Sequence, residues 1–229
     1  MSQGSRHHSS GGPAADPGAT GTPGGDRAAP AGGAPARRTV VLLAGPSGSG
    51  KSRLTRLAGL PQLRLDDFYR DGDEPGLPRT LGIVDWDDVA SWDLPGAVEA
   101  LCSLARTGRA TTPRYDISTS RAVGTRTVDL GVAAGVVAEG IFAVDLLDPC
   151  RTCGLDVVPI WLDRPREVNF TRRLVRDLRQ HRKPPSVLVR RGLALRAGEP
   201  AMRSRAVAAG FRPMSMRRAS QLVAAITHG

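Results

Sequence analysis

The chain has 229 residues, of which 40% are hydrophobic, and its formal net charge is +10. This length fits one α/β domain with a tail. No segment has the roughly 18 consecutive apolar residues of a membrane span, and the N-terminal residues carry no apolar run of the signal-peptide type. We therefore expect a cytoplasmic protein without a membrane partner.

The basic charge does not by itself predict nucleic-acid binding. Only two of the 32 basic residues, Lys51 and Lys183, are lysines, and the chain contains 27 glycines and 18 prolines. This skew indicates a compositional bias of the coding sequence, so the charge is weak evidence for a nucleic-acid surface. Aromatic residues make up only 4%, and the aromatic-basic interleaving that stacks bases is missing. A lysine retained in such a chain indicates a position that needs a compact ammonium group.

The chain falls into a tail and one domain. Residues 1–36 consist mainly of Gly, Pro, Ala and Ser, so they have little apolar surface to bury and we expect them to be disordered. Residues 39–45 (TVVLLAG) are a continuous apolar run, typical of a buried parallel strand. A helical segment follows and ends near Gly59. Residues 62–68 (QLRLDDF) predict a short strand that ends in two aspartates, and residues 70–93 a structured loop.

In the second half of the chain, predicted helices and strands continue to alternate. A helix over 94–105 precedes a predicted hairpin, and residues 135–145 and 157–163 predict two more buried strands. Pro165 opens a basic helix with Val168, Val175 and Leu178 on its apolar side. A further helix is expected to run through Leu195 and a last amphipathic helix over 214–227, with no strand evident just before it. This alternation predicts an α/β fold with a mostly parallel, doubly wound sheet.

A phosphate-binding loop follows the first strand. The segment GPSGSGKS matches G-x-x-x-x-G-K-S/T and opens a helix, as this motif requires; its residues are Gly45, Pro46, Ser47, Gly48, Ser49, Gly50, Lys51 and Ser52. The glycines let backbone N–H groups surround the phosphates, Lys51 reaches the β- and γ-phosphates, and Ser52 offers an oxygen to Mg²⁺. We therefore expect ATP and Mg²⁺ as cofactors and residues 37–229 to form a P-loop kinase domain of three layers, with a helical lid and a C-terminal helix.

Carboxylates follow two of the predicted strands. A kinase must accept the proton of the attacking hydroxyl, and ligands of α/β sheets gather at the carboxyl ends of strands. We expect Asp66, rather than Asp67, to be the base or the hydroxyl-orienting group. Glu139, at the end of a later strand, suits a magnesium-water contact.

The basic helix after Pro165 is the candidate lid. Arg172, Arg176 and Arg179 recur on one helical face. We expect Arg173 and Arg176 to approach the triphosphate and Lys183, on the following turn, to assist. Arg179 is better explained as part of a solvated basic face.

Six pieces in order resemble the uridine kinase family, which is related to phosphoribulokinase and pantothenate kinase. They are GPSGSGKS, LDDFYR, VDWDDVASWD, PRYDISTSR, VVAEGIF and TRRLVRDLRQHRK, and they cover about residues 39–185.

The resemblance implies transfer of a phosphoryl group from ATP to a nucleoside 5′-hydroxyl. Asp66 matches the catalytic aspartate, Glu139 the magnesium-associated glutamate, and Arg173 and Arg176 the phosphate-side arginines of the lid. On the acceptor side, Tyr69 and Tyr115 match base-contacting positions, Asp87 matches a carboxylate that holds sugar hydroxyls, and Arg121 belongs to the same group of substrate residues.

One departure keeps other acceptors open. The family usually has a histidine shortly after the Tyr-Asp pair, and YDISTSR has none. A kinase for another small hydroxyl-bearing metabolite, such as a sugar phosphate or a pantothenate-like molecule, is therefore an alternative. A nucleotide-binding regulatory ATPase is a second alternative. The sequence also leaves open whether the chain forms a homo-oligomer.

Overall fold

The computed structural model describes residues 38–80, 82–179 and 185–228, and all of them belong to one compact unit. Residues 1–36, predicted to be a disordered tail, and Lys183 lie outside the described residues. None of the helices in the described part of the chain is both long and apolar enough to span a membrane.

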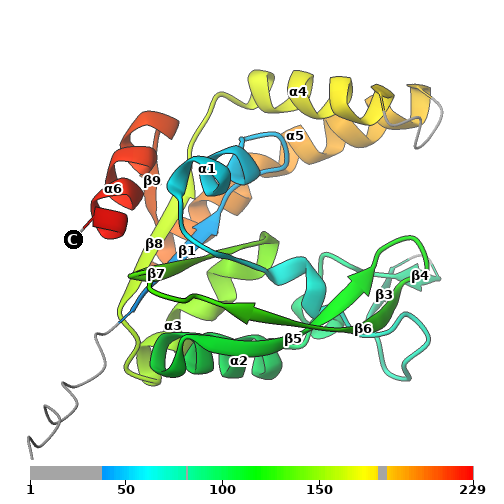
Figure 1. Ribbon diagram of the computed structural model, residues 1–229. Helices are drawn as coiled ribbons and strands as arrows, with labels where there is room; N and C mark the ends of the chain where they lie inside the picture. The colour runs from blue at the N-terminus through cyan, green and yellow to red at the C-terminus, as the bar shows by residue number, and fades with distance from the viewer. Residues whose placement is uncertain (1–37, 81, 180–184, 229) are drawn as a thin grey trace, which may run out of the picture. The chain divides into compact units, whose positions relative to one another are not determined.

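A five-stranded parallel sheet forms the centre of the molecule (Figure 1). Its order is β2 (Gln62–Arg64), β7 (Gly135–Glu139), β1 (Thr39–Ala44), β8 (Val157–Leu162) and β9 (Arg212–Met214). Every neighbouring pair is parallel. In β1 the residues from Val40 to Ala44 are at most 1% exposed. A strand covered on both faces must be apolar throughout, which explains the uninterrupted hydrophobic run in the sequence.

Helices cover both faces of this sheet (Figure 1). On one face α1 (Lys51–Ala58) and α6 (Met216–His228) pack through Leu54 and Val223 against Val41 and Leu43 of β1. On the other face, α2 (Leu94–Thr107), the 3-10 helix η3 (Ile141–Leu146) and α3 (Leu147–Thr152) pack against alternate residues such as Leu42. The predicted three-layer α/β fold with a parallel, doubly wound sheet and a C-terminal helix is confirmed.

A second group of elements extends from the carboxyl-terminal side of the sheet. The predicted hairpin consists of β5 (Arg109–Asp116) and β6 (Arg121–Asp129), which are antiparallel. The short strands β3 (Arg79–Thr80) and β4 (Ile83–Val84) and the 3-10 helix η2 (Val89–Ser91) lie within the segment expected to be a structured loop.

Two helices form the lid. α4 (Arg166–Arg179) and α5 (Pro185–Ala208) pack side by side (Figure 1). Phe170 lies against Gly192, where an added Cβ would come within 2.7 Å of the Phe170 ring. A glycine at this position therefore lets the two helices approach each other closely.

The predicted strand over residues 62–68 ends earlier than expected, whereas the strand expected to carry Glu139 at its carboxyl end does so. β2 stops at Arg64, and residues Leu65–Phe68 form the 3-10 helix η1. β7 stops at Glu139, and η3 begins two residues later. A Cβ at Gly140 would be 2.5 Å from the Leu65 Cβ, so this glycine allows η1 to pack directly beside the end of β7.

The lid region differs most from expectation. Val168, Val175 and Leu178 are 38–42% exposed, whereas Asn169 and Arg173 are buried, because α4 packs its polar side on the phosphate loop. The helix expected to end near Leu195 continues to Ala208, even though its interior contains a proline. The unexpected strand β9 has only three residues, and its proline is tolerated because β9 is an edge strand of the described sheet.

Candidate active site

The phosphate loop lies between β1 and α1. Gly48 and Gly50 have φ angles of 90° and 102°, which side chains with a Cβ rarely adopt. A Cβ at Gly48 would also come within 2.4 Å of the Asn169 carbonyl oxygen. Both the backbone conformation and the close approach of α4 therefore require glycine here. The loop thus has the sequence and backbone of a site that surrounds phosphates with N–H groups.

Lys51 begins α1 and is folded back over the loop. Its Nζ donates hydrogen bonds to the carbonyl oxygens of Gly45 at 2.8 Å and Pro46 at 3.4 Å. Burial lowers the pKa of Lys51, while the charges of Glu139 and Asp66 act in the opposite direction. The structure therefore brings together three charged residues that are far apart in the sequence.

The two neighbouring aspartates have different surroundings. Asp67 is 3% exposed and forms ion pairs with Arg126 at 3.0 Å and Arg64 at 3.7 Å. Asp66 takes part in none of the ion pairs among the described residues. Burial raises the pKa of Asp66, and the nearby Lys51 charge partly offsets this shift. The Asp67 carboxylate is thus occupied by two arginines, whereas no arginine or lysine of the described chain forms an ion pair with Asp66.

Glu139 stands at the carboxyl end of β7. Burial raises its pKa, and Lys51 and a hydrogen bond with the Ser52 hydroxyl lower it in part. Gln62 also donates from Nε2 to Glu139 Oε2 at 3.0 Å. The sequence had not singled out Gln62, because a polar residue at the start of a short strand carries no pattern of its own.

Glu139 and Ser52 fit a magnesium ion. Within the described ranges, no cluster of three or more His, Cys, Asp or Glu residues could hold a metal by itself. Mg²⁺ commonly uses one or two protein oxygens and completes its shell with water and substrate phosphates. One carboxylate and one hydroxyl beside a phosphate loop provide such a donor set.

Arginines of the lid touch the phosphate loop. Arg173 is 4% exposed, and it donates to the carbonyl oxygens of Ser47 at 3.5 Å and Gly192 at 3.3 Å. Arg176 is exposed, and its Nη2 donates to Ser47 Oγ at 3.3 Å. Arg164 donates from Nε to the Ser49 carbonyl at 3.1 Å. Sequence reasoning missed Arg164, because this residue precedes α4 and does not belong to the helical spacing of the lid arginines.

An aromatic cluster lies beside Asp66. The ring centroids of Tyr69 and Trp86 are 5.5 Å apart, and those of Tyr69 and Tyr115 are 5.8 Å apart. Burial, followed by the charges of Asp66 and Asp87, raises the pKa of Tyr69. Tyr69 therefore links the candidate base to the predicted acceptor residues. Trp86 belongs to this cluster although it had not been selected from the sequence.

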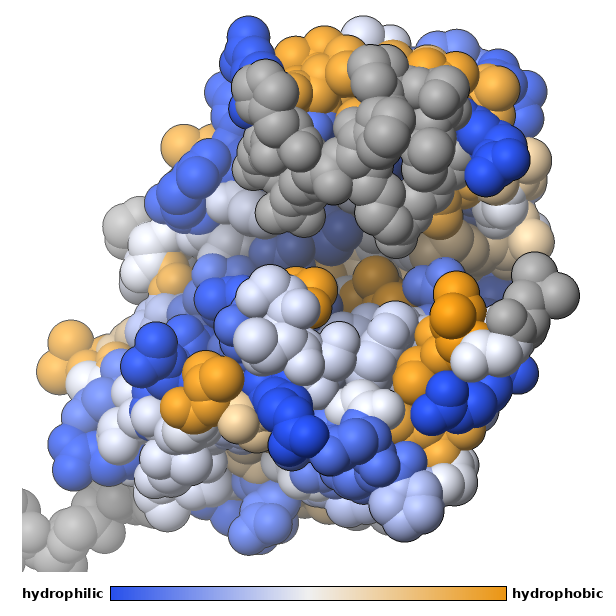
Figure 2. Space-filling model, turned by 90° about the vertical axis from the view of Figure 1, so that its right-hand side faces the viewer, coloured by the Kyte–Doolittle hydropathy of each residue, from blue (hydrophilic) through white to orange (hydrophobic). Residues whose placement is uncertain are grey.

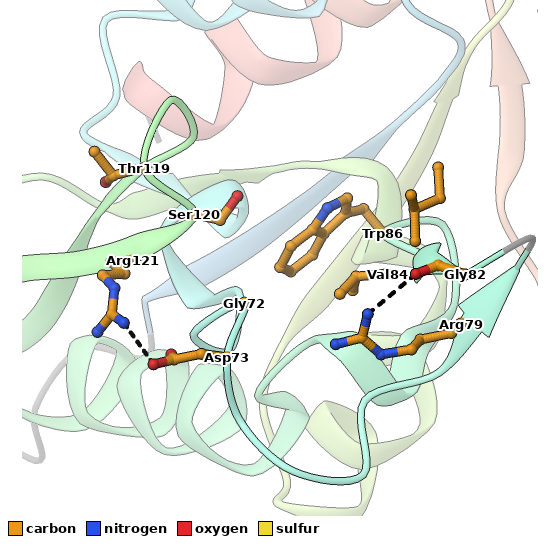
Figure 3. Close-up of a pocket in the computed structure, with 10 residues that line it drawn as sticks. Gly72, Asp73, Arg79, Gly82, Val84, Trp86, Thr119, Ser120 and Arg121 are labelled. Carbon is orange, nitrogen blue, oxygen red and sulfur yellow. Dashed lines mark hydrogen bonds and ion pairs between the residues drawn. The ribbon is translucent and has the colours of Figure 1, made fainter.

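A cavity of about 480 Å³ opens beyond Trp86 (Figure 3). Its walls include Trp86, Ser120 and two arginines, Arg79 and Arg121, of which Arg121 is paired with Asp73. Ser120 has a φ angle of 51°, an uncommon conformation for a residue other than glycine. The space-filling view shows a hollow across the same side of the molecule (Figure 2). Neither Lys51 nor Asp66 lines the cavity itself, whereas Trp86 both lines the cavity and packs against Tyr69 of the aromatic cluster.

The sequence was compared with known proteins. A uridine kinase from Deinococcus deserti is 30% identical over 165 residues, which are 69% of this chain and 77% of that protein. No protein-family model matches the chain.

Solved structures were compared as well. A protein described as a candidate fructose transport system kinase from Silicibacter sp. TM1040 has a TM-score of 0.51 and 23% identity, covering 78% of this chain and 89% of that one. This similarity supports the fold alone. A possible uridine kinase from Bacillus stearothermophilus aligns with a TM-score of 0.40 and 24% identity over 59% of this chain and 76% of that one. The similarity to the Deinococcus protein, together with the phosphate loop and the fold, shows that the chain is an ATP-dependent small-molecule kinase and belongs to the uridine kinase family.

Proposed function

We propose that this kinase transfers the γ-phosphoryl group of MgATP to the 5′-hydroxyl of a nucleoside. The observation that carries the proposal is the position of Asp66, which is half-buried near the charge of Lys51 and lies close to Tyr69 of the aromatic cluster. This arrangement supports a proposal in which Asp66 accepts the proton and the acceptor ring lies against the aromatic cluster.

Asp66 is the proposed general base. The acceptor oxygen forms the new bond to the γ-phosphorus, the bond from that phosphorus to the bridging oxygen breaks, and ADP leaves. The proton of the hydroxyl passes to an Asp66 carboxylate oxygen. Its raised pKa makes Asp66 a stronger base than an ordinary aspartate, and a base with a pKa nearer the operating pH is more effective.

The groups on the nucleotide side have separate proposed roles. Lys51 and the loop N–H groups bind the β- and γ-phosphates, and Arg176 approaches them from the lid, where Arg173 braces the loop from behind. Ser52 and Glu139 hold Mg²⁺, directly or through water. When bound, the ion neutralises charge that develops on the phosphate oxygens. Lys183, which lies outside the described residues, is a further phosphate-side candidate from the sequence.

The acceptor is proposed to bind beside the aromatic cluster. Tyr69, Trp86 and Tyr115 offer ring surfaces to a base. Asp87 is the proposed partner of sugar hydroxyls, and its loop is fixed by a 3.1 Å hydrogen bond from the Asp87 N–H to Asp85 Oδ1. Only the hydroxyl groups of residues 118–120 stand where a base-reading histidine is usual. We therefore propose a relaxed preference among bases.

A second acceptor class is favoured by one observation. Arg79 lines the cavity and donates to the Gly82 carbonyl at 3.2 Å, but no carboxylate of the described chain pairs with it. An acceptor with an anionic group would satisfy this guanidinium. A hydroxyl-bearing metabolite with a phosphate or carboxylate is therefore the alternative to a nucleoside.

A single assay separates the two classes. Purified protein is given MgATP with each of the four common ribonucleosides, or with neutral and phosphorylated sugars, and both ADP and the phosphorylated product are measured. The proposal expects product from nucleosides. Turnover confined to anionic acceptors would replace it with the second class.

A further inference from the structure

A buried carboxylate lies in the middle of the second lid helix. Glu199 of α5 is 7% exposed. Its position lies beyond residue 185, outside the part of the chain in which the family motifs occur. Carboxylates are rarely buried unless they are paired, so a role for Glu199 should be visible in its partners.

Both partners of Glu199 lie on the buried side of α4. The Oε1 atom is 3.8 Å from Arg173 Nη2, and Oε2 accepts a hydrogen bond from Asn169 Nδ2 at 3.0 Å. Asn169 is fully buried and Arg173 is 4% exposed. Glu199 therefore joins α5 to the two polar residues that α4 buries.

The same two residues contact the phosphate loop. Arg173 donates from Nη1 to the Ser47 carbonyl at 3.5 Å. The Asn169 carbonyl oxygen lies so close to Gly48 that an added Cβ would be 2.4 Å from it. Glu199 is thus connected, through Asn169 and Arg173 of α4, to the loop whose N–H groups are expected to surround the phosphates.

We propose that Glu199 is a positioning residue for nucleotide binding, which holds Arg173 and Asn169 against the phosphate loop. Without the Glu199 carboxylate, the buried Arg173 charge loses the anion that lies 3.8 Å away, so the guanidinium is held less firmly. The Ser47 carbonyl then loses its fixed donor, and the N–H groups that follow it in the loop are no longer preorganised. When a group that orients a ligand is displaced by about 1 Å, the reaction rate can fall by up to about a hundredfold.

A second ion pair between the lid helices provides a matched control. Glu167 of α4 accepts from Arg196 of α5 at 2.8 Å. The Glu167 side chain is 60% exposed, and the partners of Glu167 in the described part of the chain, Arg166, Thr171 and Arg196, all lie outside the phosphate loop. Glu167→Gln therefore removes a connection between α4 and α5 without touching the loop.

The test measures the Kd of a fluorescent MgATP analogue, which needs no knowledge of the acceptor. Wild type, Glu199→Gln and Glu167→Gln are compared at a temperature where circular dichroism shows each to be folded. We expect Glu199→Gln to weaken binding by about tenfold or more and Glu167→Gln by less than about twofold. Equal affinities of Glu199→Gln and wild type, or equal losses in both variants, would overturn the proposal.

A second variant keeps the test informative if Glu199→Gln does not fold. The double variant Arg173→Met/Glu199→Met removes both buried charges, so neither is left unpaired. It is expected to fold and still to bind MgATP at least about tenfold more weakly than wild type. In addition, Glu199→Gln should have little further effect on Kd in an Arg173→Met background. Wild-type affinity in the double variant, or fully additive losses, would contradict positioning through Arg173.

Discussion

Arg126 of the β-hairpin forms an ion pair with Asp67 of η1, with 3.0 Å between Nη2 and Oδ2. The pair fixes the hairpin to the short helix that carries both aspartates. Because Asp67 is held in this contact, we assign the proposed role of general base to Asp66. Asp66 and Asp67 are of the same type and adjacent in sequence, but their environments differ. We therefore expect different defects when each is substituted.

Substitution of the two aspartates should separate catalysis from stability. Asp66→Asn is expected to lower kcat by about 10²–10⁴-fold with little change in ATP affinity, because a positioned base contributes that much. Asp67→Asn is expected to lower the melting temperature, because the buried group loses its charge-assisted contacts at a cost of about 1–3 kcal/mol. Steady-state kinetics and thermal unfolding would measure both effects. A larger kcat defect in Asp67→Asn would show that the assignment is off by one residue.

Nucleotide turnover should depend on the ammonium group of Lys51. Lys51→Ala is expected to lose most ATP turnover while remaining folded. Lys51→Arg should also be poor, since a planar guanidinium cannot replace a compact charge that donates to the loop carbonyls. ADP release and circular dichroism are the measurements. Full turnover in Lys51→Ala would refute the site.

The pH dependence of kcat/KM should report the environment of Asp66. Burial raises the pKa of Asp66 above the ordinary value of an aspartate. A general base must be ionised, so activity should fall as the pH drops through this raised pKa, at a higher pH than for an ordinary aspartate.

A control distinguishes Asp66 from Glu139, whose pKa burial also raises. The fall of kcat/KM at low pH should persist in Glu139→Gln, although overall activity is lower. It should be missing from the pH profile of the residual activity of Asp66→Asn. A fall that disappears only in Glu139→Gln would assign the titration to the magnesium-side carboxylate instead.

Trp86 should matter for the acceptor and not for ATP. Trp86→Ala removes the ring that borders both the aromatic cluster and the cavity. Stacking on an aromatic side chain contributes about 1–3 kcal/mol per base, so the KM of a nucleoside should rise by about fivefold to a hundredfold. The Kd of MgATP should stay unchanged. An unchanged acceptor KM would place the acceptor elsewhere.

The sequence predicted the parts of the molecule that rest on local patterns. The apolar runs identified β1, β7 and β8, and the phosphate loop was identified from glycine spacing and a retained lysine. The resemblance added Tyr69, Asp87 and Tyr115, and the structure places Tyr69 within electrostatic reach of Asp66 and Asp87.

The sequence predicted the helical lid but not the length of its second helix or the way the two helices pack. The apolar residues of α5 do not gather on one face, so its length and its buried Glu199 left no periodic signal. In α4 the buried side is polar, because it contacts loop carbonyls rather than a hydrophobic core, and the apparent apolar stripe is half exposed. Gln62 and Arg164 act through contacts with residues far away in the sequence, which no local pattern encodes.

The most direct test of the account is product formation by wild type and Asp66→Asn with uridine, cytidine, adenosine and guanosine. ADP release and nucleoside 5′-monophosphate are measured together in the same reactions. The account predicts that wild type forms the two products in equal amounts with more than one base and that Asp66→Asn loses about 10²–10⁴-fold of this rate. ADP release by wild type without any nucleoside monophosphate would contradict it.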